Sequence, residues 1–212
     1  MKRINIFCGH YGSGKTNIAI NYAFYLKGKG LSVSIADIDI VNPYFRTKDS
    51  EGELEAEGIR VISLPFANTN VDLPALPAEV YSLVQNKNEY AVFDVGGDDR
   101  GAYALGRYVP YILEENNFNM FFVVNFYRPL TQTAQEALEV MREIEGACGI
   151  PFTGIINNSN LGEETTKEDI LRTAEETKKL CEISGLPLEF TCCEESTDLE
   201  SAFKLKLQKK IF

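Results

Sequence analysis

The sequence lacks features that would place the chain in a membrane or outside the cell. Nowhere does it contain about 18 consecutive apolar residues, the length at which a transmembrane helix becomes a candidate. After Met1-Lys2-Arg3, only the apolar-leaning residues from Ile4 to Cys8 precede a glycine, which is too short for the apolar region of a signal peptide. These absences predict a cytoplasmic protein.

Basic residues are also scarce. The chain has 21 Lys and Arg against 31 Asp and Glu, which gives a net charge of −10. Because a negative field repels polyanions, this balance excludes a nonspecific DNA or RNA surface and predicts no direct nucleic-acid partner. It does not exclude a nucleotide, since phosphates can be held locally by backbone N–H groups, one lysine and a divalent cation.

Paired cysteine spacings are absent. The five cysteines are an odd number without a CxxC pattern, whereas small secreted folds use an even, regularly spaced set. Reduced thiols of a cytosolic protein are therefore expected. The adjacent Cys192 and Cys193 leave a metal or redox site as the alternative, which is disfavoured because neighbouring cysteines make poor chelate geometry.

What is present is the composition of an ordinary globular domain, 44% hydrophobic and 25% charged. A chain of 212 residues corresponds to about one domain and buries roughly 70% of the surface that its unfolded form exposes. No Ser/Pro-rich linker or internal repeat divides it. We therefore expect residues 1–212 to form a single domain.

Short β-branched or aromatic runs alternate with longer helical patterns along the whole chain. The predicted strands are Arg3–Phe7, Ser32–Asp37, Arg60–Leu64, Tyr90–Asp94, Met120–Asn125, Phe152–Ile156 and Leu188–Cys192. Apolar helical stripes are predicted over Thr16–Leu26, Thr131–Glu145 and Thr166–Ser184. This alternation predicts a doubly wound α/β fold with a mainly parallel sheet of about seven strands and helices on both faces. In such folds, ligands bind at the carboxyl ends of the strands.

One motif lies where such a ligand would bind. The run Gly9-His10-Tyr11-Gly12-Ser13-Gly14-Lys15-Thr16 matches GxxxxGK[ST] in full, between a predicted strand and a predicted helix. Its glycines let backbone N–H groups approach phosphate oxygens, and the helix adds its positive N-terminal end. We expect Lys15 to reach the β- and γ-phosphates, Thr16 to complete a magnesium shell, and Asn17 to extend the nucleotide site. A chance glycine-rich turn is the alternative, which the flanking elements disfavour.

Acidic residues end two of the predicted strands. Hydrolysis of a bound triphosphate needs a carboxylate for the cation and a group that positions water. Asp37 and Asp39 end the second predicted strand, and Asp94 ends the fourth. The apolar residues before Asp94 are typical of a Walker B strand, whose carboxylate holds magnesium, and Gly97 is expected to offer its N–H to the γ-phosphate. The alternative is that these aspartates only cap helices or form turns.

Together these residues resemble the MinD/ParA/NifH class of P-loop ATPases, which shares the CobQ/CobB/MinD/ParA nucleotide-binding domain. The resemblance covers nearly the whole chain and rests on the loop at 9–16, Asp37-Ile38-Asp39 as switch I, Asp94-Val95-Gly96-Gly97 as switch II, and Gly154-Ile155-Ile156-Asn157-Asn158-Ser159. It implies that Asp39 positions the attacking water and that Asp37 lies near magnesium. It also implies that Asn158, with Asn157 beside it, binds the adenine edge. No aspartate of the NKxD type follows them, which favours adenine over guanine.

The chain departs from this family at His10. Members that hydrolyse ATP as face-to-face dimers usually have a signature lysine there, which reaches the partner's phosphates. A histidine is shorter and mostly neutral at pH 7, so trans-activation and a homodimer through the nucleotide face stay open. The histidine is interpreted either as a pH-sensitive substitute or, the favoured alternative, as a loop residue facing solvent or Tyr11.

The C-terminal segment Phe203–Phe212 is basic and apolar. Leu199, Phe203 and Leu207 fit the core-facing stripe of a last helix, which is the favoured prediction. A short amphipathic membrane helix is the alternative, and membrane attachment is disfavoured because the segment is barely three turns long.

The sequence as a whole predicts a protein that binds ATP or ADP with Mg²⁺. The favoured function is that of a slow ATPase whose switch state is read by an unidentified protein partner. A small-molecule kinase or ligase resembling dethiobiotin synthetase is one alternative, with Phe66–Pro77 as its candidate acceptor loop. A nonhydrolysing ATP-binding regulator is the other, and the missing signature lysine favours it.

Overall fold

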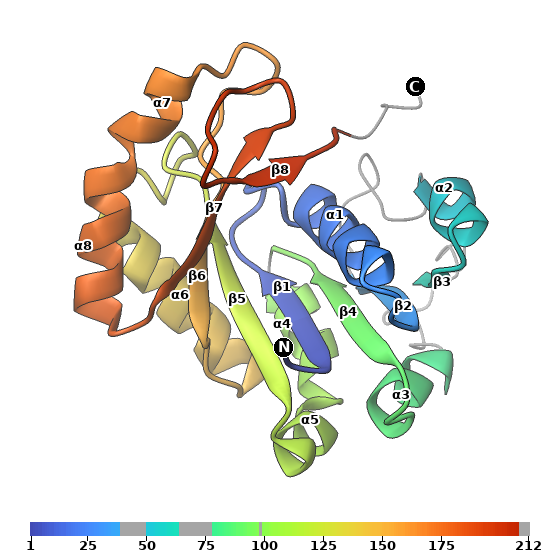
Figure 1. The fold of residues 1–212 in the computed structure, drawn as a ribbon. Helices are drawn as coiled ribbons and strands as arrows, with labels where there is room; N and C mark the ends of the chain where they lie inside the picture. Colours follow the sequence, from blue (N-terminus) through green and yellow to red (C-terminus); the bar gives the residue numbers. More distant parts are fainter. Residues whose placement is uncertain (39–49, 64–77, 98, 208–212) are drawn as a thin grey trace, which may run out of the picture.

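The structure, a computed structural model, describes residues 1–38, 50–63, 78–97 and 99–207. Asp39, the Phe66–Pro77 loop and the last five residues of the basic tail therefore lie outside the described residues. Figure 1 shows helices packed around a central sheet.

Within these described ranges, eight parallel strands form the sheet, in the order β3-β2-β4-β1-β5-β6-β7-β8. They are β1 Ile4–Cys8, β2 Val33–Ile38, β3 Arg60–Ser63, β4 Tyr90–Val95, β5 Phe118–Val124, β6 Gly154–Asn157, β7 Leu188–Glu194 and β8 Phe203–Leu205. The predicted α/β fold with a parallel sheet is confirmed, and the seven predicted strands match β1 to β7. Because all strands run the same way, their carboxyl ends share one edge of the sheet.

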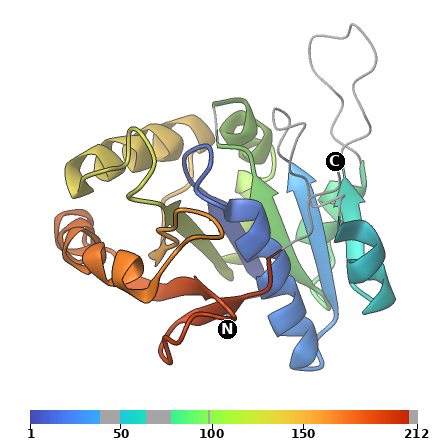
Figure 2. The same ribbon diagram turned by 90° about the horizontal axis from the view of Figure 1, so that it is seen from above.

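Helices cover both faces of the sheet, as predicted (Figure 2). Those in the described residues are α1 Lys15–Gly28, α2 Glu51–Ala56, α3 Ala78–Gln85, α4 Asp99–Gly106, α5 Val109–Glu115, α6 Ala134–Cys148, α7 Lys167–Arg172 and α8 Ala174–Ser184. Side chains of α1, α2 and β8 form one buried cluster with the sheet. Side chains of α3, α4, α5, α6 and α8 form a second cluster on the opposite face. The fold thus has the three-layer arrangement that buries both faces of a parallel sheet.

The helix predicted over Thr166–Ser184 is interrupted at Thr173, which separates α7 from α8. The Thr173 hydroxyl donates to the Ile170 carbonyl over 2.7 Å and accepts from the side-chain amide of Asn157 over 3.0 Å. A threonine that bonds its own preceding turn competes with the regular helical pattern, and here β6 holds it in place. The prediction of one continuous helix was therefore wrong.

The prediction of a C-terminal helix was also wrong, because residues 203–205 form the edge strand β8. Leu205 is buried whereas Lys204 between the two apolar residues is exposed, which is the two-residue period of a strand. The Phe203 ring stacks on Phe190 of β7 at 4.8 Å between centroids. Beyond the strand, the Asn21 side chain of α1 accepts from the Lys206 N–H and donates to its carbonyl. Contacts with β7 and α1 therefore decide the structure of this segment.

A buried ion pair closes the amino edge of the sheet. Arg3 and Glu115 are 5% and 7% exposed, and the Arg3 Nη2 and Glu115 Oε2 atoms lie 2.5 Å apart. Arg3 Nη1 also donates to the carbonyls of Leu83, Asn86 and Glu89. The hydrogen bond from Arg3 lowers the pKa of Glu115 below the usual range, although burial raises this pKa. This pair joins β1 to α5 and to the segment before β4.

None of the helices within the described residues combines the length and the apolar character needed to cross a membrane. The five cysteines are free thiols, of which Cys181 alone is partly exposed.

Candidate functional site

The GxxxxGK[ST] loop joins the carboxyl end of the central strand β1 to the start of α1 (Figure 1). Gly14 is the N-cap of α1, and no side chain in the described part of the chain caps the helix. The first turn also contains no acidic residue. The first N–H groups of a helix have no partner within the helix, and they lie at its positive end. The start of α1 is thus an uncapped set of donors suited to an anion.

The backbone of this loop requires glycine at several positions. Gly12 and Gly14 have φ angles of +77° and +87°, the left-handed region that L side chains rarely adopt. A Cβ on Gly9 would lie 2.2 Å from the carbonyl oxygen of Val123, the neighbouring β5 backbone. A Cβ on Gly14 would lie 2.3 Å from the side-chain nitrogen of Asn158. The loop is therefore packed tightly against the ends of β5 and β6.

Lys15 and Gly97 meet over the loop. Lys15 is only 6% exposed, and its Nζ donates to the His10 carbonyl over 3.3 Å. A Cβ on Gly97 would lie 2.7 Å from the Tyr11 backbone nitrogen and 2.9 Å from Lys15 Nζ. The segment after β4 thus approaches the loop so closely that only glycine fits.

Two of the predicted acidic residues lie side by side next to the loop. Asp37 of β2 and Asp94 of β4 are register partners, and Asp94 is also the partner of Phe7 in β1. Both are buried, at 5% and 1% exposure. Burial raises the pKa of the neighbouring Cys8 thiol well above its ordinary value, Lys15 lowers it and Asp94 raises it. The charges of Lys15 and Asp94 therefore both act on the carboxyl end of β1.

These oxygen donors suit a magnesium ion. Mg²⁺ takes hard oxygen ligands, usually one or two carboxylates together with phosphate oxygens and water. Thr16 lies at the start of α1 and is 8% exposed. Asp94 lies on β4, which pairs with β1, and Asp37 lies on β2, the next strand in the sheet order. The predicted metal residues are thus placed at one end of the sheet, around the phosphate loop.

The asparagine that ends β6, Asn157, and the one that follows it, Asn158, point in different directions. The Asn158 side chain donates to the Ser13 carbonyl of the loop over 2.7 Å. The Asn157 side chain donates to Thr173 and accepts from the N–H and hydroxyl of Ser159. Successive side chains of a strand lie on opposite faces, so only one of the pair can reach the loop. The structure brings Asn158 to the phosphate loop and Asn157 to α7 and α8.

His10 and Tyr11 form the outer part of the loop. His10 is half-buried, with Nδ1 3.1 Å from the Tyr11 carbonyl, whereas the Tyr11 side chain is 60% exposed. Asn17, in the first turn of α1, is buried and its carbonyl accepts from Asn21.

Arg128, which was not predicted as a site residue, contacts the loop from the segment after β5. Arg128 is exposed, and its Nε donates to the Gly12 carbonyl over 3.2 Å. Its position just beyond a predicted strand, at the carboxyl edge where ligands bind, is a signal that could have identified it.

A phosphate loop between a central parallel strand and a helix, with acidic residues on neighbouring strands, defines the class of P-loop nucleotide-binding proteins. The sequence profile of the CobQ/CobB/MinD/ParA nucleotide binding domain (CbiA) matches residues 6–170. The chain belongs to this family, which confirms the resemblance seen in its motifs. No curated protein sequence matches the chain.

Solved structures of FtsY have the same fold. The cell division protein FtsY of Thermotoga maritima is 20% identical, with a TM-score of 0.64, over 92% of this chain and 63% of that one. The chloroplast FtsY of Physcomitrella patens is 17% identical, with a TM-score of 0.59, over 92% and 60%. The signal recognition particle receptor FtsY of Elizabethkingia anophelis, in complex with GDP, is 13% identical, with a TM-score of 0.54, over 99% and 61%. This chain thus spans about three fifths of their lengths, and the likeness is one of fold.

Proposed function

We propose that the chain binds Mg-ATP in the loop Gly9–Thr16 and hydrolyses it slowly, as a switch whose state is read by a protein partner. One observation carries the proposal: the uncapped start of α1 lies beside a buried lysine and a pair of buried carboxylates. A buried lysine and buried acids around an uncapped helix start suit an anionic ligand together with a divalent cation. A triphosphate with its cation supplies both charges.

Each group of the loop has a role in this proposal. Lys15 contacts the β- and γ-phosphates, and Asn17 extends the site along α1. The loop amides of His10, Tyr11 and Gly12 complete the cradle. Thr16, Asp37 and Asp94 would hold Mg²⁺, which when bound neutralises charge on the phosphate oxygens. The close packing of Gly97 on the loop supports a role for its N–H at the γ-phosphate.

Adenine is the base that we propose. The side-chain nitrogen of Asn158 donates to the Ser13 carbonyl of the loop, and the side-chain oxygen has no hydrogen bond within the described ranges. This oxygen is therefore suited to accept a hydrogen bond from the exocyclic amine of adenine. Asn157 would support this segment through Thr173 rather than touch the base. The FtsY complex with GDP makes GTP the necessary competitor in any test.

Slow hydrolysis is proposed because His10 occupies the position of the signature lysine, and its Nδ1 lies 3.1 Å from the Tyr11 carbonyl oxygen. Asp39 is proposed to position the attacking water. A nonhydrolysing regulator is the second candidate, favoured by the same histidine.

A partner would contact the carboxyl edge of the sheet, because large apolar side chains are exposed on its loops. Tyr11, Leu130 and Leu161 are 60%, 62% and 52% exposed, and they belong to the loops after β1, β5 and β6. Exposed apolar side chains gathered around a ligand site suit a contact that depends on the ligand. A homodimer through this face is one form of the contact.

We further propose a single domain over residues 1–212, since β1 and β8 belong to one sheet. We also propose a cytoplasmic location.

Phosphate release with ATP alone tests the proposal. We expect slow, Mg-dependent release, stronger competition by ATP than by GTP, and loss of release without loss of ATP binding in Asp39→Ala. Asp198→Ala, which removes an exposed acid from the β7–β8 loop, is the matched control and should behave as the wild type. Tight ATP binding without turnover would establish the nonhydrolysing regulator instead. ATP consumption only after a metabolite is added would establish a kinase or ligase, and equal competition by GTP would contradict the base assignment.

A further inference from the structure

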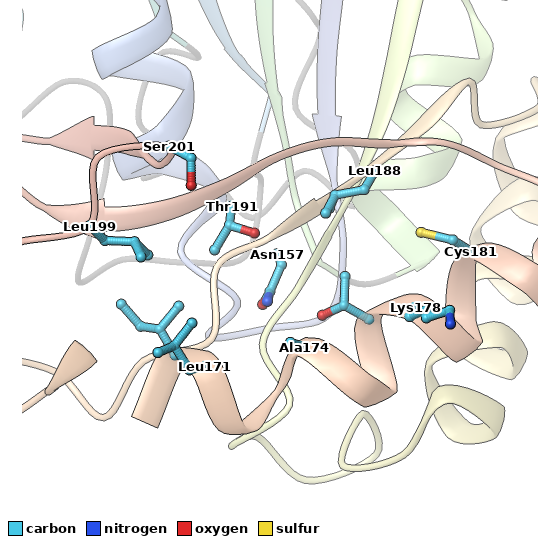
Figure 3. A pocket seen from close by; sticks show the side chains of 11 residues that line it. Asn157, Leu171, Ala174, Lys178, Cys181, Leu188, Thr191, Leu199 and Ser201 are labelled. Carbon is cyan, nitrogen blue, oxygen red and sulfur yellow. The ribbon is translucent and has the colours of Figure 1, made fainter. Parts of the chain in front are cut away.

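A groove lies on the far side of Asn157 from the phosphate loop. It has a volume of about 360 Å³, and helices α7 and α8 form one wall while β7 forms the other. Figure 3 shows Leu171 and Leu199 at one end and Leu188 and Cys181 at the other. No residue of the phosphate loop lines it. The groove is therefore separate from the proposed nucleotide site.

The strand wall of this groove has an open edge. Leu188 to Thr191 pair with β6 along the inner edge of β7, whereas β8 pairs with the outer edge only from Cys192 to Glu194. Within the described ranges, no strand pairs with the outer edge of residues 188–191. Unpaired N–H and C=O groups of an edge strand are a template for an added strand.

Apolar side chains beside this edge are also exposed. Leu171 of α7 is 51% exposed and Leu188 of β7 is 44% exposed, and both line the groove. A strand edge next to an apolar groove is the arrangement that recognises an extended peptide, because backbone bonds give affinity and the groove takes alternate side chains. An apolar small molecule would fit the volume but would leave the strand edge unpaired.

Charge defines the chemistry of the occupant. Residues 163–200, which form α7, α8, β7 and their loops, contain 12 Asp or Glu and 4 Lys or Arg, a net charge of −8 out of the chain's −10. These acids surround the groove and do not line it: the one charged side chain in its lining is Lys178, whose Nζ lies 3.8 Å from Glu182 Oε1. The surface around the groove is therefore suited to a basic segment whose basic side chains lie outside the groove itself.

The chain itself shows how such a segment pairs with β7. On the other half of the same edge, β8 places Phe203 and Leu205 toward the protein and leaves Lys204 exposed. Apolar residues thus alternate with lysine in the strand that β7 already accepts.

We propose that the outer edge of β7 at residues 188–191, with the groove below it, binds an extended segment of a partner protein in which apolar and basic side chains alternate. The segment adds a strand to the sheet ahead of β8. One apolar side chain enters the groove near Leu171 and Ala174, and the basic side chains lie over the acidic surface. This interaction does not depend on the proposed nucleotide function.

A synthetic peptide, FKLKL, capped at both ends and labelled with a fluorophore, is the probe. The peptide KKFLL, of equal composition and charge but without alternation, is its control. We expect FKLKL to raise the fluorescence anisotropy with at least about tenfold higher affinity than KKFLL. We also expect it to slow amide hydrogen exchange at residues 188–191 and to slow alkylation of Cys181, the cysteine that is partly exposed and lines the groove.

Two matched protein variants separate the groove from the rest of the acidic surface. Leu171→Lys changes an exposed residue that lines the groove, whereas Ile183→Lys changes a residue of α8 that is 47% exposed and does not line it. We expect Leu171→Lys to weaken FKLKL binding by at least about tenfold and Ile183→Lys by less than about twofold. Thermal melting of both variants checks that they fold, and Ala174→Phe, which fills the groove, gives an independent second test. Lys15→Ala should bind the peptide as the wild type does.

Several results would overturn the proposal. Equal binding of FKLKL and KKFLL would show a purely electrostatic attraction to the acidic surface. Faster exchange at residues 203–207 on peptide binding would show that β8 is displaced and that the open edge is not used. No binding, or binding that both Leu171→Lys and Ala174→Phe leave intact, would show that the groove is not a peptide site.

Discussion

Replacing Asn158 by alanine tests how the end of β6 shapes the phosphate loop. The change removes the 2.7 Å hydrogen bond that the buried Asn158 side chain donates to the Ser13 carbonyl. Leaving a buried acceptor without its donor costs about 1–3 kcal/mol. If the bound nucleotide must restore the loop, this energy appears as an affinity loss of about 5- to 150-fold.

Calorimetric titration with Mg-ATP and with inorganic triphosphate separates the two roles of this side chain. A defect in the loop weakens both ligands, whereas loss of a base contact weakens ATP alone. We expect triphosphate affinity to fall within the range above and ATP affinity to fall further. Asn160→Ala is the control, because Asn160 donates to the Asn158 carbonyl and not to the loop, and its affinities should change by less than about twofold. Unchanged triphosphate affinity in Asn158→Ala would refute the role of the hydrogen bond in the loop.

Three further substitutions test other parts of the structure. Gly97→Ala places a Cβ 2.7 Å from a backbone nitrogen of the phosphate loop. In urea titrations it should lower the free energy of unfolding by about 1–3 kcal/mol, and it should also weaken ATP binding. Gly146→Ala is the control: a Cβ there meets open space in α6, so the free energy of unfolding should rise by about 0.5–1 kcal/mol in the same titrations. Glu115→Gln should lower the free energy of unfolding by about 3 kcal/mol at pH 7. This is the lower end of the range for a broken buried ion pair, because backbone carbonyls still accept hydrogen bonds from Arg3. Since the folded-state pKa of Glu115 is lowered, its contribution is present above the unfolded pKa and is lost as pH falls through the folded value, so wild type and variant should converge in acid, and a constant gap would contradict this pair. Burial raises the pKa of Tyr108 to about 12, and its hydroxyl is buried with no partner in the described residues, so Tyr108→Phe should stabilise by about 1–2 kcal/mol, and a loss of stability would show a missed partner.

The fold was predictable because its signals are local. Buried parallel strands are apolar along their length, and the ends of β1 to β7 lie within two residues of the predicted ones. The phosphate loop was predictable for the same reason, since its glycines and lysine are contiguous in the sequence.

Elements held by distant contacts were not predictable. β8 is short, and its strand conformation depends on stacking against Phe190 and on the Asn21 side chain of α1, which lies 185 residues away from Lys206. The break at Thr173 depends on the Asn157 amide, which belongs to another element. A single-sequence pattern contains no signal for such partners.

The site was predictable in its residues more than in its geometry. The paired positions of Asp37 and Asp94 follow from strand ends, but the sheet order that makes them register partners does not. The opposite directions of Asn157 and Asn158 follow from the strand period, once the boundary of β6 is known. Arg128 donates to the Gly12 carbonyl from the segment after β5, and this contact with a loop 116 residues away in the sequence could not be predicted from the residues around Arg128.

Isothermal titration calorimetry of Mg-ATP with the wild-type protein and with Lys15→Ala tests the central claim most directly. A buried lysine that contacts the phosphates predicts one site per chain in the wild type and an affinity at least about 100-fold lower in the variant, equivalent to about 2.7 kcal/mol or more. Equal affinity in the two proteins, with the variant folded, would contradict the assignment of the loop Gly9–Thr16 as the nucleotide site.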